Sequence, residues 1–420
     1  MVKIIVLGAG NMGAYIAFNL SAENDVTIAD YSQAALDKVI GISIKKIKTD
    51  LSDLKNIKHE IAGFDLVVSA LPESFGYRAL KSVIMSGKNV VDISFWEQDK
   101  KRLSELEALA KKHGVTVFID CGIAPGFSNG LVAFFDSLLS GKTKNASIYV
   151  GGIPKDKEKG FFAPWSISGL IEEYQRKALC VHNNSHKRVT ALSVIKKISF
   201  PGVGELEGAI TDGLRTLPDN LKHVRNMSEF TLRYPGHFSQ MKMLKSLGYF
   251  DDGLISVRQD KVTAYELSQI LLKKFIKKNR KTDEEILADL GFYDKTYEYE
   301  CIKKKVSPRK VAVSVLSKRW KMNIDDRDVL VMRVEADDGK TQYTADVYAE
   351  HDGISSAMAL TTGGMAALAA RAIFIKKFEL KGVFPLEKAI KEKPELMQYF
   401  SRGLQKLGVL LLEKPKTLLK

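Results

Sequence analysis

Residues 3–20 read KIIVLGAGNMGAYIAFNL, and this stretch decides the fold of the first part of the chain. Its apolar run, Ile4–Leu7, is typical of a strand buried on both faces of a parallel sheet. Three glycines with GxGxxG spacing follow, and the residues after them have helical character. A strand, a glycine-rich turn and a helix in this order predict the first βα unit of a Rossmann domain.

Each glycine of the turn has a use if the turn holds a dinucleotide. Gly8 allows the tight turn, Gly10 lets a pyrophosphate approach the backbone, and Gly13 lets the helix pack close to the strand. Asn11 and Met12 lie at the start of the helix, where free N–H groups and a partial positive charge favour phosphate. We therefore predict that these five residues contact a cofactor.

The next apolar stretch, DVTIAD, reads as a second strand that ends at Asp30. An acidic residue there accepts hydrogen bonds from the adenosine ribose and repels a 2′-phosphate. No arginine follows at once in DYSQAAL, so we expect NAD in preference to NADP. A Rossmann-like turn without a ligand is the structural alternative.

Three further strands, FDLVVSALP, NVVDISF and GVTVFIDCG, alternate with helical segments. In a doubly wound sheet the ligand lies over the carboxyl ends of the strands. The residues at those ends should line one crevice, with nicotinamide at its far end. They are Ser69, Ala70, Leu71, Pro72, Asp92, Ser94, Asp120 and Cys121.

The rhythm changes after residue 125. NASIYVGGIP, KVAVSVLSKRW, DVLVMRVEADD and KTQYTADVYAEHDG read as strands, and ADDGK gives a hairpin signal. We predict an α/β fold: a Rossmann doubly wound parallel sheet with an inserted α+β domain. Residues 1–125 and 350–375 would form the NAD-binding domain and 126–349 the substrate and dimerisation domain. Residues 376–420 would be a basic, mainly helical C-terminal segment.

Composition excludes several other classes. The net charge is +14, but the lysines are scattered along helical segments, so we expect solvated faces and no nucleic-acid partner. No apolar run is long enough to span a membrane, and no secretory signal can be fitted at the N-terminus. The 3 cysteines stand apart, which favours a reducing cytoplasm, and no cluster suggests a metal site.

Several phrases occur in a fixed order: GAGNMG, VVDISF, DCGIAPGFSN, IYVGGIP, WSISGLIEEY, TDGLRTL and TLRYPGHFSQMKMLKSLGYF. Together they resemble the saccharopine dehydrogenase superfamily, and most of all its lysine 6-dehydrogenase branch. The likeness covers most of Met1 to Arg371. It implies a homodimer or larger homo-oligomer and NAD-linked oxidation at a C–N bond of an amino acid substrate.

The resemblance leaves three functions open. The lysine branch converts the 6-amino group of L-lysine to allysine, which cyclises to piperideine-6-carboxylate, and releases ammonia. The saccharopine branch oxidises or forms a secondary amine that joins lysine to 2-oxoglutarate. A non-catalytic NAD-binding regulator is the third possibility.

One position departs from the saccharopine reductases. They carry aspartate before the Pro-Gly of this turn, in a GLDPG-like phrase, whereas this chain reads GIAPG with Ala124. The lysine 6-dehydrogenase group also has alanine there. The missing carboxylate favours a primary amine substrate.

Oxidation of an amine requires a base, because a protonated nitrogen cannot form the iminium. His237, in RYPGH, is one candidate, since a neutral imidazole suits the task. The alternative is a histidine that caps a helix beginning at Phe238. Asp120 could orient water or the amine from its strand end. Cys121 is the third candidate, although a free cysteine is more often a small buried side chain.

An amino acid substrate also carries a carboxylate, which a guanidinium can hold with two hydrogen bonds. Arg233 and Arg215 are the candidate clamps within the resemblance. Ordinary ion pairing with a neighbour such as Asp212 is the alternative. Further candidates for the pocket are Thr211, Asp212 and Tyr234. Trp165 and Tyr174 would form a lid or a pocket wall.

Overall fold

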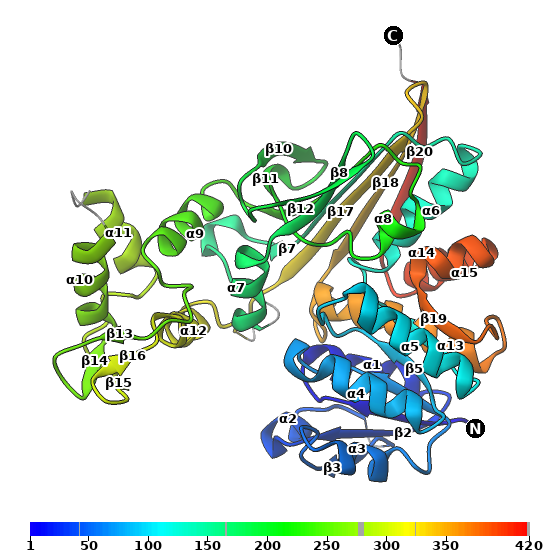
Figure 1. The fold of residues 1–420 in the computed structure, drawn as a ribbon, viewed down its shortest axis with the longest axis horizontal. Coiled ribbons are helices and arrows are strands. Elements are labelled where there is room, and N and C mark those ends of the chain that lie inside the picture. The colour runs from blue at the N-terminus through cyan, green and yellow to red at the C-terminus, as the bar shows by residue number, and fades with distance from the viewer. Residues whose placement is uncertain (42, 164–165, 276–280, 324, 418–420) are drawn as a thin grey trace.

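The structure is a computed structural model that describes the chain except for residues 42, 164–165, 276–280, 324 and 418–420. The ribbon has three parts (Figure 1): a nucleotide-type domain at the N-terminus, a broad mixed sheet beside it, and a helical arm that extends from the far side of that sheet. The α/β architecture predicted from the sequence is confirmed.

The first sheet is parallel and has the strand order β19-β6-β5-β4-β1-β2-β3. The order reverses between β1 and β4, and the carboxyl ends of strands at such a point are where doubly wound sheets bind ligands. Its strands are β1 Lys3–Leu7, β2 Asp25–Asp30, β3 Lys45–Lys48, β4 Leu66–Ser69, β5 Asn89–Asp92, β6 Thr116–Ile119 and β19 Gly382–Pro385.

Helices cover both faces of this sheet, and alternation along β1 shows how. Ile4 and Val6 pack into a core shared with α1 and α13, whereas Ile5 and Leu7 pack against α3, α4 and α5. The helices are α1 Asn11–Ser21, α2 Gln33–Asp37, α3 Leu54–Glu60, α4 Glu73–Met85, α5 Lys100–Lys112 and α13 Gly364–Phe374. Burial of both faces explains why these strands read as continuous apolar runs.

The second sheet is mixed, with the path β10-β11-β12-β7-β17-β18-β20 and with β8 and β9 attached at β12. β17 and β18 form the hairpin that the ADDGK turn predicted. The strands are β7 Asn145–Pro154, β8 Ala178–His182, β9 Ser185–Val189, β10 Ile195–Phe200, β11 Gly204–Ile210, β12 Asn226–Arg233, β17 Asp328–Asp337, β18 Thr341–Glu350 and β20 Leu410–Thr417. Its helical segments are α6 Phe127–Leu138, a 3₁₀ turn at Lys157–Lys159, α7 Ile167–Gln175 and α8 Leu217–Asn220.

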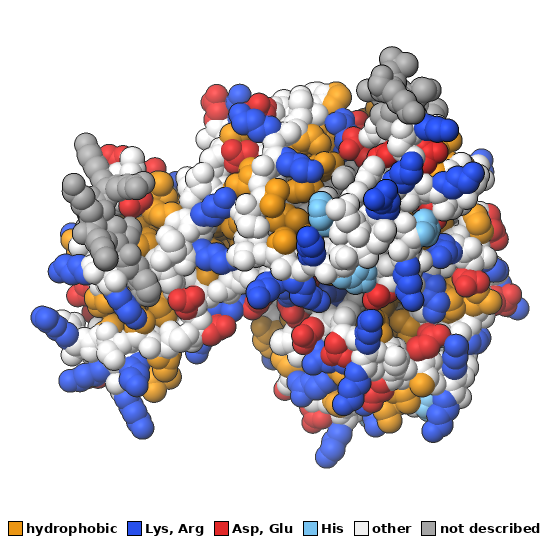
Figure 2. Space-filling view, turned by 45° about the horizontal axis from the view of Figure 1, so that its top comes forward, with side chains coloured by type: hydrophobic (Ala, Val, Ile, Leu, Met, Phe, Trp, Pro, Cys, Tyr) orange, Lys and Arg blue, Asp and Glu red, His pale blue; other side chains and the backbone are white. Residues whose placement is uncertain are grey.

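The helical arm has a hydrophobic core separate from those of the nucleotide domain, and residues of α7 also pack into it. A notch separates the arm from the nucleotide domain on the face drawn in Figure 2. The arm contains α9 His237–Ser246, β13 Ile255–Ser256, β14 Lys261–Thr263, α10 Ala264–Phe275, α11 Lys281–Asp289, β15 Glu298–Glu300, β16 Lys305–Val306 and α12 Pro308–Arg319.

The strand predicted for residues 310–320 is wrong, because this segment forms most of α12. The Ser307 side chain caps the helix by accepting a hydrogen bond from the Lys310 N–H, and Pro308 occupies the first turn. Val311 and Val315 lie one helical turn apart on the buried face. The valines suggested a strand, but the cap and the packing of that face decide for a helix.

The C-terminal segment also differs from the prediction. Residues 376–420 are not mainly helical: β19 extends the first sheet and β20 extends the second, with α14 Leu386–Glu392 and α15 Glu395–Lys406 between them. Before them, a π-helical turn at Ala359–Gly363 leads into α13. A Cβ on Gly363 would lie 2.8 Å from a ring carbon of Tyr15, so this glycine allows close packing on α1. Across the described ranges of the whole chain, no helix has the length and apolar character needed to cross a membrane.

Candidate active site

The glycine-rich turn between β1 and α1 has the geometry that the sequence predicted. Gly8 has φ +102°, and a Cβ on it would lie 2.7 Å from the Ala70 carbonyl oxygen. A Cβ on Gly13 would lie 1.9 Å from the Gly8 carbonyl oxygen, so only glycine allows the helix to pack this close to the turn. A Cβ on Gly10 would meet no described atom within 4 Å, so this backbone is open to a ligand.

These residues fit a dinucleotide. Helix α1 begins at Asn11, followed by Met12, and its N-cap Gly10 supplies no capping side chain, so N–H groups of the first turn remain for phosphate oxygens. Asp30 stands beside the turn, where its carboxylate accepts hydrogen bonds from the Ala9 N–H at 2.7 Å and the Ser32 N–H at 2.8 Å. The carboxylate therefore lies next to the open backbone of the turn.

The carboxyl end of β4 forms one wall of this region. Ser69 ends the strand and is buried, Ala70 approaches Gly8, and Pro72 is the N-cap of α4. Leu71 is buried against the core under α3, α4 and α5. These four residues lie where the sequence placed them, at a strand end next to the glycine turn.

Asp92 and Ser94 lie at the end of β5, but their side chains are turned inward. Asp92 is fully buried and accepts hydrogen bonds from Ser94 Oγ at 2.6 Å and Trp96 Nε1 at 3.1 Å. Burial raises the pKa of Asp92 to about 6, and the hydrogen bonds from Ser94 and Trp96 oppose that rise. The Asp92 carboxylate therefore holds the loop after β5 in place and has no exposed surface to offer a cofactor.

Asp120 and Cys121, after β6, have opposite characters. Cys121 is completely buried, and burial together with Asp120 and Asp92 raises the pKa of its thiol well above the usual range. A thiol of this kind is a packing group and a poor nucleophile. Asp120 has a left-handed backbone, φ 49°, and its carboxylate accepts a hydrogen bond from Gln98 Nε2 at 2.7 Å.

An ion pair joins Asp120 to the second domain. Arg215, in the loop between β11 and α8, places its Nε 3.2 Å from Asp120 Oδ1, and both side chains are about 95% buried. The same guanidinium donates to the Trp96 carbonyl oxygen at 2.6 Å and lies 3.9 Å from the Phe95 ring centre. Arg215 was predicted as a substrate clamp, and here it connects the two domains at the end of β6.

A second arginine reaches the same ring. Arg176, directly after α7, lies 4.6 Å from the Phe95 ring centre and donates to both carboxylate oxygens of Glu73 at 2.7 and 2.8 Å. Phe95 therefore has a guanidinium contact from each of two segments of the second domain. The loop after β5 is the surface on which Arg176 and Arg215 meet the nucleotide domain.

His237, Tyr174 and Arg233 form a separate buried group. His237 Nε2 lies 3.0 Å from the Tyr174 hydroxyl, which accepts from Arg233 Nε at 3.1 Å. Either the Tyr174 hydroxyl or the His237 Nε2–H donates in this contact, depending on the tautomer of the histidine, because the hydroxyl oxygen can accept a second hydrogen bond beside that from Arg233. Burial, with Arg233 nearby, lowers the pKa of His237 well below its usual value, so the imidazole stays neutral. Helix α9 begins at His237 itself, one residue before the expected start.

Three of the remaining candidates are held by backbone or side-chain contacts. Tyr234 donates to the Pro154 carbonyl oxygen at 2.9 Å, and Asp212 accepts from the Leu179 N–H at 2.9 Å. Thr211 donates to Glu229 at 2.6 Å. Trp165 lies outside the described residues.

Sequence reasoning missed a polar face on β12. Glu229, Thr231 and Arg233 alternate with Phe230 and Leu232, so the first three side chains share one face of the strand and the other two pack into a core. Glu229, Thr231 and Arg233 are each less than 7% exposed. The alternation in EFTLR was the available signal, because three consecutive polar positions on one strand face are unusual in a buried strand.

Helix α7 connects the two groups. Glu173 and Tyr174 contact the polar face of β12, while Arg176 at its C-terminal end contacts Glu73 and Phe95 of the nucleotide domain. The structure thus brings Asp120 together with Arg215, and His237 together with Arg233, as two groups on either side of one short helix.

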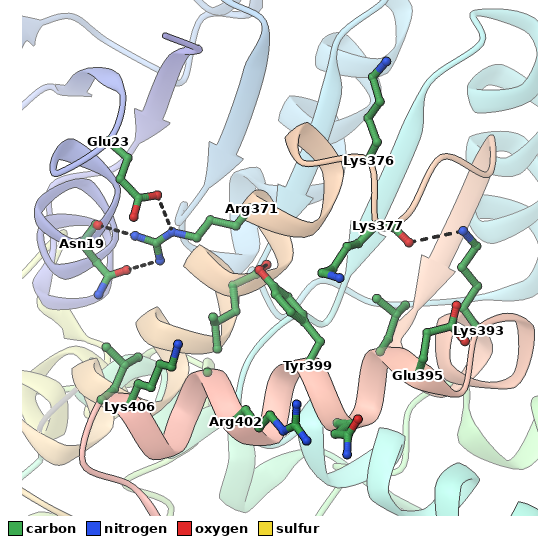
Figure 3. Close-up of a pocket in the computed structure, with 15 residues that line it drawn as sticks. Asn19, Glu23, Arg371, Lys376, Lys377, Lys393, Glu395, Tyr399, Arg402 and Lys406 are labelled. Carbon is green, nitrogen blue, oxygen red and sulfur yellow. Dashed lines mark hydrogen bonds and ion pairs between the residues drawn. The ribbon is translucent and has the colours of Figure 1, made fainter.

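A basic groove of about 790 Å³ lies elsewhere, between α1, α13 and α15. Figure 3 shows Arg371 bonded to Asn19 and Glu23, and Lys393 bonded to the Lys377 carbonyl. Because α1 runs from the glycine turn back toward the start of β2, this groove lies near the amino ends of the strands, whereas the dinucleotide turn lies at their carboxyl ends.

Comparison with known families agrees with this architecture. Residues 4–118 match the family described as saccharopine dehydrogenase NADP binding domain, and residues 122–409 match the saccharopine dehydrogenase C-terminal domain. The two matches together cover the first sheet, the arm and the second sheet except β20.

Relatives and a solved structure extend over nearly the whole chain. The NADP(+), L-glutamate-forming saccharopine dehydrogenase of Saccharomyces cerevisiae is 25% identical, over 98% of this chain and 99% of that protein. The Pyricularia oryzae protein of the same name is 23% identical, over 83% and 86%. The apo structure of the histidine-tagged S. cerevisiae enzyme shares the fold, with a TM-score of 0.77 and 21% identity over 99% of this chain and 100% of that one. The chain is therefore an oxidoreductase of the saccharopine dehydrogenase family, with a nicotinamide-nucleotide-binding domain at its N-terminus.

Proposed function

We propose that this protein oxidises the 6-amino group of L-lysine with NAD, giving allysine and ammonia. The observation that carries the proposal is Ala124 in the turn after β6, at the position where saccharopine reductases carry an aspartate and the lysine 6-dehydrogenase branch carries alanine. Gly122 and Gly126 bring the turn back on itself, with the Phe127 N–H bonded to the Gly122 carbonyl at 2.9 Å. The half-buried Ala124 adds a methyl group and no charge to this part of the site.

The protein must first favour the neutral amine. The ammonium group of free lysine has a pKa of about 10.4, so a site that desolvates the amine and accepts its proton is needed. A bound nicotinamide dinucleotide supplies the hydride acceptor. His237 is neutral and its Nε2 contacts the Tyr174 hydroxyl, so a substrate proton would reach this nitrogen through that hydroxyl.

Asp120 is the second candidate for work at the amine. Its carboxylate stands at the end of β6, in the crevice expected for nicotinamide, and Arg215 and Gln98 hold it in place. A carboxylate fixed in this way can orient an ammonium group or a water molecule. Arg215 and Arg233 remain the candidate partners for the substrate carboxylate.

Saccharopine is the second candidate substrate, and the names of the full-length relatives favour it. In saccharopine the same lysine nitrogen is a secondary amine, so its release would give glutamate instead of ammonia. A panel of L-lysine, saccharopine, ornithine and simple diamines, assayed with NAD and NADP by reduced-cofactor absorbance, separates these substrates. Cofactor binding without turnover of any amine would favour the regulator.

The choice of NAD rests on Asp30. Its carboxylate lies beside the glycine turn and would repel a 2′-phosphate, although the matching domain family and the relatives are named for NADP. Dissociation constants for NAD and NADP measured on the same preparation test this choice directly.

A further inference from the structure

Four side chains form a continuous row of hydrogen bonds between β11, β12 and α7. Thr211 Oγ1 lies 2.6 Å from Glu229 Oε2 and 2.9 Å from Thr231 Oγ1. Thr231 Oγ1 in turn contacts Glu173 Oε1 in a short hydrogen bond. The row therefore has a carboxyl group at each end and two hydroxyl groups between them.

A count of hydrogens decides the state of this row. Its three contacts require three protons, one between each pair of oxygens, but two threonine hydroxyls supply only two. If all three contacts are hydrogen bonds, the third proton comes from one of the two carboxyl groups, because two threonine hydroxyls cannot also supply the contact at 2.9 Å between them. The geometry is therefore that of a row with room for one carboxyl proton.

The two ends of the row differ in their surroundings. Glu229 is 4% exposed, and Gly213 makes room for it: a Cβ there would lie 2.6 Å from the Glu229 carboxyl carbon. Glu173 lies on α7 and is partly exposed. One end is therefore sealed, and the other reaches solvent and stands next to Tyr174.

We propose that Glu229, Thr211, Thr231 and Glu173 form a proton-holding chain that stores one proton and passes it between the buried and the partly exposed carboxyl group. When Glu173 gives up a proton, that proton goes to Thr231 Oγ1. The Thr231 hydroxyl proton passes to Thr211, and the Thr211 proton passes to Glu229 Oε2. Three O–H bonds break and three form, and no electrons are transferred.

The electrostatics agree with a stored proton on the buried end. Burial, together with repulsion from Glu173 and Asp212, raises the pKa of Glu229 to about 8 against the opposing effect of the hydrogen bonds from Thr211 and the Gly213 N–H. Arg233, the next residue on the same face of β12, is the positive group near this row. Neutral Glu229 is thus the favoured form at neutral pH.

The use of the chain in catalysis rests on the proposed function. The chain ends at Glu173, beside Tyr174, and Tyr174 contacts Arg233 and His237. Because one end of the chain lies at the group of Tyr174, Arg233 and His237, the chain can take up the proton that an amine substrate must lose. It can also return that proton to the bound amine. The storage of the proton itself does not depend on which substrate the enzyme takes.

Infrared spectroscopy of the full-length protein tests the storage. The wild type should show the carbonyl band of a protonated carboxyl group at neutral pH, sensitive to exchange into D₂O, and Glu229→Gln should abolish it. Thr231→Val keeps the side-chain volume but removes the middle of the chain, so the pH midpoint of the band should fall by about one unit, a tenfold loss of proton affinity. Thr344→Val, on β18, is the matched control and should leave the band and its midpoint unchanged.

The absence of the band in the wild type at neutral pH would overturn the proposal, as would an unchanged midpoint in Thr231→Val. Thr211→Val provides an independent interruption of the chain if either other variant fails to fold. Turnover of lysine without the band would refute the proton chain alone. The band without turnover of any amine would refute the proposed function alone.

Discussion

The backbones of Asp120 and Arg215 are both left-handed, with φ 49° and 53°, and their side chains meet across the two domains with Nε 3.2 Å from Oδ1. Left-handed geometry is costly at positions other than glycine, so the surrounding contacts must hold both backbones in this conformation. The pair fixes the end of β6, where the nicotinamide ring is expected, relative to the loop that carries Thr211 and Arg215.

Replacement of Arg215 by alanine should weaken both the domain contact and the site. Asp120 would remain about 95% buried without its cation, which costs on the order of 3–5 kcal/mol. We expect a lower unfolding midpoint and a raised KM for the amine, with dinucleotide affinity changed less than about threefold. Calorimetry, steady-state kinetics and fluorescence titration measure the three quantities.

A double-mutant cycle with Asp120→Asn isolates the pair itself. A coupling free energy of about 1–3 kcal/mol is expected for side chains in direct contact. Arg188→Ala, on the exposed strand β9, is the matched control and should change neither stability nor kinetics. Additive effects of the two substitutions would contradict a direct domain tie.

Asp30→Ala should weaken NAD binding strongly and reduce the preference for NAD over NADP. The reason is the loss of an acceptor for the ribose hydroxyls and of a negative charge that repels a 2′-phosphate. Isothermal titration with both cofactors measures the change, and Asp37→Ala, on the exposed side of α2, serves as the control. Equal NAD affinity in wild type and Asp30→Ala would remove the ribose assignment.

Gly126→Ala should destabilise the turn after β6 far more than an alanine at another left-handed glycine. Gly126 has φ +128°, and a Cβ there would lie 2.3 Å from the Gly122 carbonyl oxygen and 2.5 Å from that of Asp120. We expect a loss of about 3 kcal/mol or more in the free energy of unfolding.

Gly87→Ala is the control for this substitution, because Gly87 also has a positive φ, +69°, while a Cβ on it would meet no described atom within 4 Å. Strain alone should cost it about 1 kcal/mol. Equal losses for the two variants in urea unfolding would show that the close backbone contacts at Gly126 are unimportant.

Glu229 should make stability depend on pH. Its pKa rises from an ordinary value of 4.5 to about 8 in the folded protein, mainly through burial. Because the folded value exceeds the unfolded one, the protonated form stabilises the fold below pH 4.5, and this contribution is lost as pH rises through 8. Glu229→Gln cannot ionise, so the wild type should lose a few kcal/mol relative to the variant between about pH 4.5 and 8.

Chemical unfolding at a series of pH values measures this difference. Glu205→Gln, at an exposed position of β11, is the control and should follow the wild-type curve. If the curves of the wild type and Glu229→Gln ran parallel over this window, Glu229 would not be a stored proton.

The nucleotide domain could be predicted because its signals are local. The apolar run of β1, the spacing of Gly8, Gly10 and Gly13, and the acidic end of β2 each lie within a few residues, and each element was found where it was expected. The failure at residues 310–320 is also local: β-branched residues are compatible with both a strand and a buried helix, and only the Ser307-Pro308 cap in front of them favours the helix.

The candidate site was predicted less completely, because its geometry depends on long-range contacts. Nothing near Arg215 in the sequence indicates a partner 95 positions away, since the pairing arises when the loop after β11 docks against β6. Asp92 was expected to face the crevice, but the direction of its side chain is set by Ser94 and Trp96 in the following loop. The polar face of β12 had a readable alternation, whereas its partner Glu173 could be identified only once α7 was placed.

In the proposed reaction the nitrogen that leaves the lysine skeleton is released as ammonia. The decisive measurement follows reduced cofactor, ammonia and glutamate together in reactions with NAD and either L-lysine or saccharopine. We expect one ammonia for each NADH formed from L-lysine and little turnover of saccharopine. Rapid formation of glutamate from saccharopine, with no ammonia from L-lysine, would contradict it.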